Sequence, residues 1–235
     1  MKINKLSKNY LITGTSSGIG NAIAKYLLSN KHQVIGISRS KNNINSKNYI
    51  HISEDISKEY CGKKVVEILK ANKVKLDGFV NNAGINIPNK FNKISRTDFN
   101  KVMDVNLAAP FFLTQKITNF FNKQASIVNI SSFSAISGGP VSSHYAISKA
   151  GLEAFTKNLS IFFSKKKIRV NAISPGLIRT RLAKNFKKHP YYERILLNRI
   201  GEPKEIANVV DFLLSTKSSY INGQIINVDG GMFLK

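Results

Sequence analysis

Short apolar runs alternate with longer amphipathic stretches along most of this 235-residue chain. Apolar runs of about four to eight residues bounded by turn residues are typical of buried strands, and stretches with apolar residues every three or four positions are typical of helices. We expect strands at residues 9–13, 32–37, 49–52, 76–82, 125–131 and 167–174, and a last one within GQIINV (223–228). We expect helices at about 18–30, 57–72, 97–122 and 203–215, and one that carries Tyr145 and Lys149 and ends near 164.

This alternation of strand and helix predicts an α/β fold with a single Rossmann-type, doubly wound parallel sheet of about seven strands and helices on both faces. The length suits one domain over 1–235, and the chain has no internal repeat and no linker. The link between the second and third strands, SRSKNNINSKN, is too short and too rich in Asn and Lys to predict a helix.

The first strand runs into a glycine-rich turn, TGTSSGIG, that opens the first helix. Glycines let the backbone approach a pyrophosphate, and a helix N-terminus offers unpaired N–H groups and the positive end of its dipole. The spacing is Gly-x-x-x-Gly-x-Gly, and the simpler interpretation is a tight turn. Its position between a buried strand and a helix favours a dinucleotide site that uses Gly14, Ser16, Ser17, Gly18, Ile19 and Gly20.

The end of the second strand bears on which dinucleotide binds. Proteins that bind NAD tend to place an acid there for the ribose 2′-hydroxyl, whereas an arginine suits a 2′-phosphate. Here Ser38 and Arg39 end the strand, and no acid follows until Glu54. The sequence therefore favours NADP(H) and keeps NAD(H) as the alternative, although Arg39 could also be an ordinary solvated loop residue.

Tyr145 and Lys149 stand four residues apart, which places them on one helix face, and Ser132 precedes the tyrosine by thirteen residues. An ammonium near a phenol favours the phenolate and lowers the phenol pKa, which would make Tyr145 a usable proton donor and acceptor. A Tyr-x-x-x-Lys pair alone is common on helices, so this interpretation depends on the rest of the chain.

Composition limits the other possibilities. The single cysteine, Cys61, excludes an internal disulfide, and one Cys with four His gives no metal-ligand cluster. We find no apolar run of about 18 residues, no signal-peptide stretch and no nucleic-acid-binding signature, so we expect a cytoplasmic protein that binds neither membrane nor nucleic acid. The net charge of +23 comes mostly from 29 Lys spread from end to end, which fits either a compositional bias or an anionic partner.

Several motifs together give the chain its resemblance to a family. Asn81-Asn82-Ala83-Gly84 follows the fourth strand, Asn106 lies in DVNLAAP, and Pro175-Gly176 precedes Thr180. With the glycine turn and Ser132, Tyr145 and Lys149, these motifs resemble the short-chain dehydrogenase/reductases over about residues 9–233. The C-terminal YINGQIINVDGG resembles the 3-oxoacyl-(acyl-carrier-protein) reductase branch.

The resemblance implies a role for each matching residue. Tyr145 would exchange a proton with the substrate oxygen, Ser132 would hydrogen-bond that oxygen, and Lys149 would bind the ribose and lower the tyrosine pKa. Asn106 would kink its helix and hold a water that links Lys149 to solvent. Hydride would pass between the nicotinamide and a carbonyl or alcohol carbon. The implied cofactor-binding residues further along the chain are Asp55, Ile56, Asn82, Ala83, Gly84, Tyr145, Lys149, Pro175, Gly176, Ile178 and Thr180.

The resemblance also implies a substrate lid and an assembly. The lid, at about 181–200, is basic and aromatic, and it is either a clamp for an anionic or extended substrate or a solvated helix with Ile195 and Leu196 facing inward. The family commonly forms tetramers, so we expect a homotetramer or homodimer built on the 97–122 and 143–164 helices and the C-terminal strand. We expect the aromatic residues of those helices to pack in the core as the default, with some of them at the interface: Phe111, Phe112, Phe120, Phe121, Phe155, Phe162 and Phe163.

Three functions remain open. The first is reduction of a 3-oxoacyl thioester on an acidic carrier protein, for which Lys123 and Lys166 fall close to the branch's docking arginines. The second is oxidation or reduction of a small ketone, sugar or secondary metabolite. The third is a non-catalytic nucleotide-binding regulator, against which the complete set of Asn106, Ser132, Tyr145 and Lys149 argues.

Overall fold

The computed structural model describes residues 7–180 and 189–234, and its centre is a parallel sheet of seven strands. The strand order is β3-β2-β1-β4-β5-β6-β7, so the doubly wound fold predicted from the sequence is confirmed. The strands are β1 (Asn9–Thr13), β2 (Gln33–Ser38), β3 (Tyr49–Ser53), β4 (Leu76–Asn81), β5 (Phe121–Ile130), β6 (Arg169–Pro175) and β7 (Ile225–Val228).

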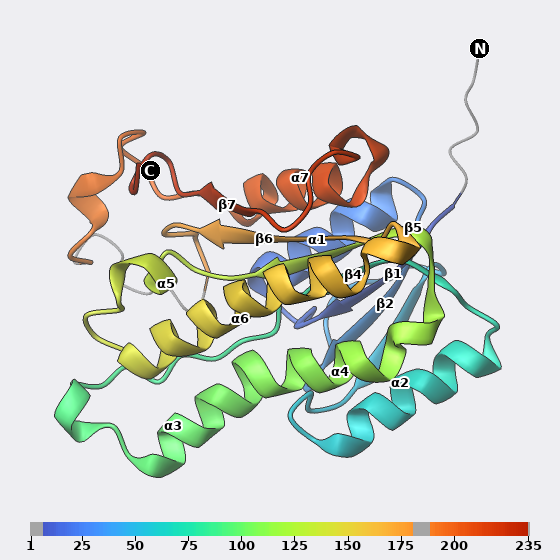
Figure 1. Cartoon of the computed structure of the whole chain (residues 1–235), viewed down its shortest axis with the longest axis horizontal. Coiled ribbons are helices and arrows are strands. Elements are labelled where there is room, and N and C mark those ends of the chain that lie inside the picture. Colours follow the sequence, from blue (N-terminus) through green and yellow to red (C-terminus); the bar gives the residue numbers. More distant parts are fainter. Residues whose placement is uncertain (1–6, 181–188, 235) are drawn as a thin grey trace.

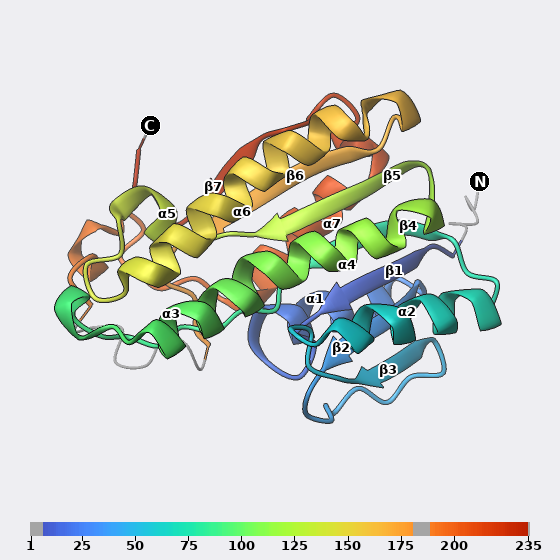
Figure 2. The same cartoon turned by 60° about the horizontal axis from the view of Figure 1, so that its bottom comes forward.

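Helices cover both faces of the sheet (Figures 1 and 2). On one face lie α2 (Glu59–Ala71), α4 (Ala109–Ile117) and α6 (Ser143–Phe162), and on the other α1 (Gly18–Ser29) and α7 (Pro203–Leu214). Successive residues of a strand point to opposite faces. Leu11 therefore packs with α2, α4 and α6, while Tyr10 and Ile12 pack with α1 and α7.

The crevice of this fold lies where the chain changes direction across the sheet. β1 pairs with β2 on one side and with β4 on the other, so the connections that follow β1 and β4 leave the sheet in opposite directions. The carboxyl ends of the strands, the short helix α5 (Ser134–Ser137) and residues 189–200 gather at the same end of the molecule (Figures 1 and 2). A ligand site is expected there.

The helix predicted at 97–122 is not continuous. It consists of α3 (Arg96–Met103), a π-helical turn at Asp104–Ala108 and α4, which ends at Ile117. A 3-10 turn, Thr118–Phe120, follows, and β5 already begins at Phe121. A π turn is a single-turn irregularity inside an otherwise helical stretch, and DVNLA contains neither Gly nor Pro that would mark it in the sequence.

The link between β2 and β3 contains no helix over the described residues 39–48, as the sequence predicted. Tyr49 of β3 packs against the sheet at Gly36, where an added Cβ would collide with the Tyr49 hydroxyl. That hydroxyl lies 2.8 Å from Oγ1 of Thr15 and accepts a hydrogen bond from Nδ2 of Asn42 at 2.6 Å. Tyr49 thus ties the link between β2 and β3 to the glycine turn.

Candidate active site

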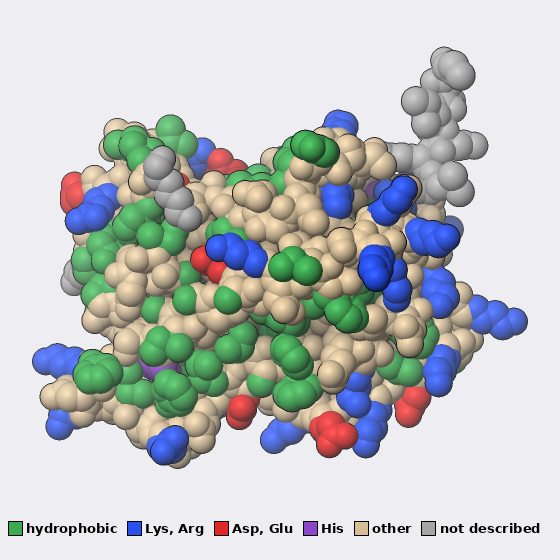
Figure 3. Space-filling view, in the orientation of Figure 1, with side chains coloured by type: hydrophobic (Ala, Val, Ile, Leu, Met, Phe, Trp, Pro, Cys, Tyr) green, Lys and Arg blue, Asp and Glu red, His purple; other side chains and the backbone are tan. Residues whose placement is uncertain are grey.

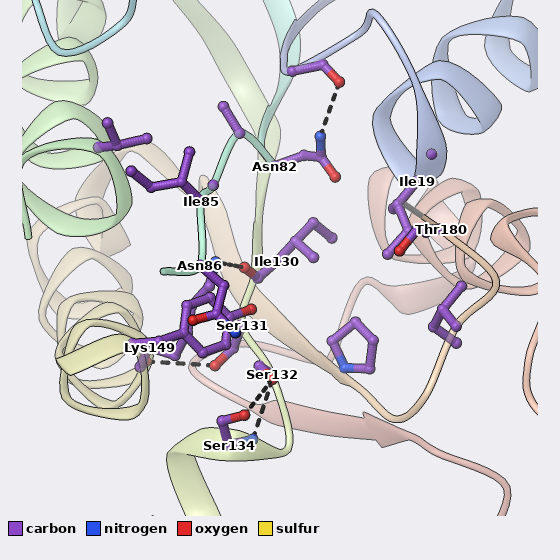
Figure 4. Close-up of a pocket in the computed structure, with 18 of the residues that line it drawn as sticks. Ile19, Asn82, Ile85, Asn86, Ile130, Ser131, Ser132, Ser134, Lys149 and Thr180 are labelled. Atoms are coloured by element: carbon purple, nitrogen blue, oxygen red, sulfur yellow. Dashed lines mark hydrogen bonds between the residues drawn. The ribbon is translucent and has the colours of Figure 1, made fainter. Parts of the chain in front are cut away.

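A cavity of about 630 Å³ opens along the carboxyl ends of the strands, from the glycine turn to the start of α6 (Figure 4). Its walls contain nearly all of the residues that the sequence singled out: Gly14, Ser16, Ser17, Gly18, Ile19, Ser38, Arg39, Asp55, Ile56, Asn82, Ala83, Gly84, Ser132, Tyr145, Lys149, Pro175, Gly176, Ile178 and Thr180. Gly20 and Asn106 lie behind the wall and do not line the cavity.

The glycine turn is packed tightly against the loop that follows β4. Gly14 has a φ of +78°, and a Cβ there would lie 2.7 Å from Nδ2 of Asn82. A Cβ on Gly20 would collide with the carbonyl of Gly14. At the N-terminus of α1, the Ser17 side chain makes no capping hydrogen bond, so the first-turn N–H groups remain available at the cavity wall. These features fit a pyrophosphate.

The motif after β4 is fixed to the end of β1. Oγ1 of Thr13 accepts hydrogen bonds from the backbone N–H groups of Asn82 and Ala83, both at 3.0 Å. Nδ2 of Asn82 donates to the carbonyl of Thr13 at 2.8 Å (Figure 4 shows Asn82 beside the turn). The two strand ends that form the crevice are therefore joined by side-chain hydrogen bonds.

Ser132 lies at the cavity, two residues beyond β5. Its Oγ accepts a hydrogen bond from the backbone N–H of Ser134 at 3.1 Å, and its hydroxyl donates to Oγ of Ser134 at 3.2 Å. The same Oγ lies beside the phenol of Tyr145, where hydrogen bonding to it acts to lower the tyrosine pKa. The neighbouring Ser131 instead donates to Oε1 of Glu153 at 2.7 Å. Of the serines clustered after β5, Ser132 is therefore the one held beside Tyr145.

Lys149 is buried, and its Nζ donates to the carbonyl of Ile130 at 2.8 Å. Burial lowers the pKa of Lys149 to about 8. The Nζ lies 5.7 Å from the centroid of the Tyr145 ring. Burial also raises the pKa of Tyr145, and the hydrogen bond with Ser132 lowers it only in part. The expectation that Lys149 lowers the tyrosine pKa stays a prediction; in this structure the ammonium donates to Ile130, and burial acts against the phenolate.

Asn106 lies in the π turn and is completely buried. Its Nδ2 donates to the carbonyl of Ile85 at 2.9 Å and to Oγ of Ser148 at 3.0 Å, and its Oδ1 accepts from the Ile85 N–H at 2.8 Å. A Cβ on Gly84 would lie 3.3 Å from Oδ1 of Asn106 and 3.4 Å from Nζ of Lys149. Asn106 therefore joins the irregular helix to the loop beside Lys149.

The far end of the cavity is lined by Arg39 and two acids. Arg39 is exposed at the end of β2, and Glu54 is paired with Lys64, whose Nζ lies 2.5 Å from Oε1 of Glu54. Burial acts to raise the pKa of Asp55, but hydrogen bonds from Ser57 and the charge of Arg39 outweigh it, so that pKa is lowered. Arg39 is thus an exposed cation on this part of the cavity wall, and its charge acts on Asp55.

One end of the cavity lies beside Ser132 and Tyr145, and we call it the catalytic end. Five residues of its lining were not predicted from the sequence. Asn86, Phe133, Ser142, Leu177 and His189 all lie on its wall. Asn86 and Ser142 stand beside recognised motifs, two residues after Gly84 and three before Tyr145, and this proximity is the one signal that could have found them. Phe133 and His189 meet edge to face, with ring centroids 5.6 Å apart.

Part of the predicted lid, residues 181–188, lies outside the described residues. The described part, 189–200, contains a single 3-10 turn, Tyr192–Arg194, instead of the solvated helix considered from the sequence. Ile195 is buried as expected, but Leu196 is 64% exposed, so its predicted inward orientation is wrong. Residues 189–200 form a loop without helical periodicity, and Tyr191 and Ile195 of this loop pack in the cluster around Phe133.

Among residues 7–180 and 189–234, no group of three or more His, Cys, Asp or Glu is arranged to hold a metal ion. Within the same ranges, none of the helices combines the length and the apolar character needed to cross a membrane.

Comparisons with known proteins agree with this geometry. A family model described as enoyl-(acyl carrier protein) reductase matches residues 14–233. The 3-oxoacyl-(acyl-carrier-protein) reductase of Rickettsia felis is 37% identical over 244 residues, which cover 99% of each chain. This chain belongs to the short-chain dehydrogenase/reductase family. Members of this family are oxidoreductases that act on CH–OH and C=O groups, so the predicted enzyme class is confirmed.

Solved short-chain dehydrogenases/reductases share the whole fold. A glucose/ribitol dehydrogenase of the family from Brucella melitensis has a TM-score of 0.91 at 28% identity, over 97% of each chain. A 3-ketoacyl-(acyl-carrier-protein) reductase from Brucella melitensis, complexed with NADH, has a TM-score of 0.90 at 29% identity, over 97% of this chain and 98% of that one.

Proposed function

We propose that the chain is an NADP(H)-dependent carbonyl reductase that acts on 3-oxoacyl thioesters. The observation that carries the proposal is the contact of Ser132 with Tyr145, beside buried Lys149, in the same cavity as the glycine turn. A bound nicotinamide would supply the hydride that reaches the carbonyl carbon.

Tyr145 would donate the proton that the reduced carbonyl oxygen requires. The phenol carries the proton and lies beside Ser132, so it would act as the general acid. Ser132 would hydrogen-bond the same oxygen, since the Ser134 N–H holds its hydroxyl in place. The carbon gains the hydride and the oxygen gains the proton, which gives an alcohol. Oxidation would run the same steps in reverse.

Lys149 and Asn106 would hold the reacting parts in position. The Lys149 ammonium lies against Gly84 at the wall, where it would bind the ribose hydroxyls. Asn106 would keep Ile85 and Ser148 fixed behind it. The water that Asn106 is expected to hold stays a prediction.

The remaining wall would bind the cofactor from phosphates to nicotinamide. The turn from Gly14 to Gly20 would hold the pyrophosphate, Asp55 and Ile56 the adenine, and Pro175, Gly176, Ile178 and Thr180 the nicotinamide. Arg39 supports a 2′-phosphate, because its exposed guanidinium at the end of β2 can bind a phosphate with two hydrogen bonds and Glu54, on the same wall, is already paired with Lys64. The NADH complex of the Brucella melitensis 3-ketoacyl reductase makes NAD(H) the alternative to test.

The catalytic end supports an acyl substrate. Phe133, Val141 and Leu177 give it apolar walls, which suit an acyl chain better than a polyol. The names of two relatives point to 3-oxoacyl substrates, while the glucose/ribitol dehydrogenase keeps a sugar as the second candidate. Lys123 and Lys166 are exposed at the amino ends of β5 and β6, opposite the cavity, so within one chain they do not support carrier docking at its mouth.

We also propose that the chain assembles with copies of itself through α4 and α6. Phe121 and Phe163 are buried, but Phe111, Phe112 and Phe162 are 44%, 57% and 64% exposed. Figure 3 shows hydrophobic side chains over these two helices. A surface of this kind is typical of an interface, so the default assignment of these aromatics to the core holds for only part of the set.

Absorbance of NADPH, followed with three substrate sets, tests the proposal. The sets are acetoacetyl-N-acetylcysteamine with its carrier-protein counterpart, a panel of sugars and a panel of small ketones. We expect NADPH consumption with the thioesters at kcat/KM values well above those of the other sets. Faster turnover of a sugar would replace the substrate class, and nucleotide binding without any turnover would favour a regulator.

A further inference from the structure

Asn86 stands at the catalytic end of the cavity, two residues after the motif that lines the cofactor region. Figure 4 places it with Ile85, Ser131 and Lys149 on one side of the cavity, opposite Ile19 and Thr180. Its side chain therefore belongs to the region where a substrate would meet Ser132 and Tyr145, and none of the roles above uses it.

The Asn86 side chain is held in one orientation. Its Oδ1 accepts a hydrogen bond from the hydroxyl of Ser142, a buried residue at the N-cap position of α6, three positions before Tyr145. The preceding residue, Ile85, is fixed at both its N–H and its carbonyl by Asn106. The carboxamide is thus tied to the two elements that carry the catalytic residues.

This arrangement leaves the Nδ2 donors of Asn86 without an acceptor. Over residues 7–180 and 189–234, no hydrogen bond from Nδ2 is formed, while Oδ1 is already paired. Much of the nearby wall is apolar, with Pro88, Phe133 and Val141. An amide donor facing an apolar cavity gains most from an acceptor on the ligand.

We propose that Asn86, held by Ser142, is a substrate subsite that binds a second oxygen acceptor on the substrate, distinct from the oxygen that reacts at Tyr145. The ligand class is a 1,3-dicarbonyl compound, such as a 3-oxoacyl thioester, whose thioester carbonyl accepts from Nδ2. This inference rests on the proposed carbonyl reduction and deepens it. A ketone with one carbonyl leaves Nδ2 unpaired, so the subsite selects against it.

The test compares two substrates in matched variants. One substrate is acetoacetyl-N-acetylcysteamine, and the other is the same molecule with a methylene in place of the thioester carbonyl. Asn86→Leu removes the donor at similar size, and Asn86→Asp keeps the acceptor for Ser142 but replaces the donor with a second oxygen. Asn89→Leu, on the exposed part of the same loop and outside the cavity wall, is the control.

The quantity measured is the ratio of kcat/KM for the dicarbonyl to kcat/KM for the monoketone. We expect this ratio to fall by about 5–10-fold in Asn86→Leu, the effect of losing one neutral hydrogen bond, and further in Asn86→Asp. Asn89→Leu should keep the wild-type ratio. Thermal unfolding and NADPH binding, measured on each variant, separate loss of the subsite from loss of the fold.

An unchanged ratio in both Asn86 variants overturns the inference. This holds whether both kcat/KM values stay at the wild-type level or fall by the same factor, and an equal fall is the mark of a structural residue. Either result leaves the proposed function standing, because the wild type still turns over. Absence of wild-type turnover with every carbonyl substrate contradicts the proposed function, and this inference with it.

Discussion

The buried ammonium of Lys149 should make the stability of the protein depend on pH in a predictable way. Burial lowers its pKa from 10.5 to about 8 in the folded chain. In the unfolded chain the lysine recovers its ordinary pKa, so between these values the unfolded state binds one proton more than the folded state. Stability therefore rises with pH through this window, and the gain is complete above 10.5 and lost as the pH falls through about 8.

The size of the effect follows from the same shift. A difference of about 2.5 pH units corresponds to about 3 kcal/mol, at about 1.36 kcal/mol for each unit. The assay is urea unfolding of the wild type and of Lys149→Met between pH 7 and 11. Taking the difference between the two proteins removes the contribution of the other titrating lysines. Wild-type stability relative to the variant should increase by about 3 kcal/mol across the range.

Lys157→Met is the matched control, because Lys157 is exposed on the same helix. That variant should differ from the wild type by a nearly constant free energy of unfolding. A constant difference for Lys149→Met as well would refute the reasoning, since it would mean that burial imposes no penalty on the ammonium. A wild-type stability that falls relative to Lys149→Met as the pH rises would mean that the folded chain raises the pKa of Lys149, which contradicts the argument.

Three other predictions test separate parts of the structure. Tyr49→Phe should raise the Kd of NADPH about 3–10-fold in a fluorescence titration, because the hydroxyl that joins Thr15 and Asn42 is lost. The control is Tyr26→Phe, which should leave this Kd unchanged, since the Tyr26 hydroxyl makes no hydrogen bond within the described ranges. Arg39→Ala should weaken NADPH binding by about 10–100-fold and NADH binding little, and an equal loss would show that Arg39 does not read the 2′-phosphate. Phe162→Lys should give a smaller particle in analytical ultracentrifugation, and an unchanged mass would remove α6 from the interface.

The sequence predicted the sheet well because its signals are local and repeated. The inner strands β1, β2, β4 and β6 are buried along nearly all of their length, so each reads as an apolar run, and the glycine turn is specified by its own backbone geometry. The cavity residues around Tyr145 and Lys149 were predicted because they lie within recognisable motifs at strand ends.

Other features depend on contacts between distant segments, and the sequence pattern does not record them. The π turn is associated with the hydrogen bonds of Asn106 to Ile85, twenty-one positions away. The packing of Tyr49 over Gly36 joins two neighbouring strands through one side chain, a contact that no periodicity in the sequence indicates. The effect of burial on Tyr145, which acts to raise its pKa, likewise depends on packing that the spacing to Lys149 does not record.

Turnover of the Tyr145→Phe variant tests the central claim most directly. NADPH oxidation with acetoacetyl-N-acetylcysteamine should proceed in the wild type and fall by about 10²–10⁴-fold in the variant, because the proton donor is lost. The Kd for NADPH should change little, since Lys149 and the glycine turn remain. A variant that keeps wild-type turnover would contradict the assignment of Tyr145 as the acid, and with it the proposed mechanism.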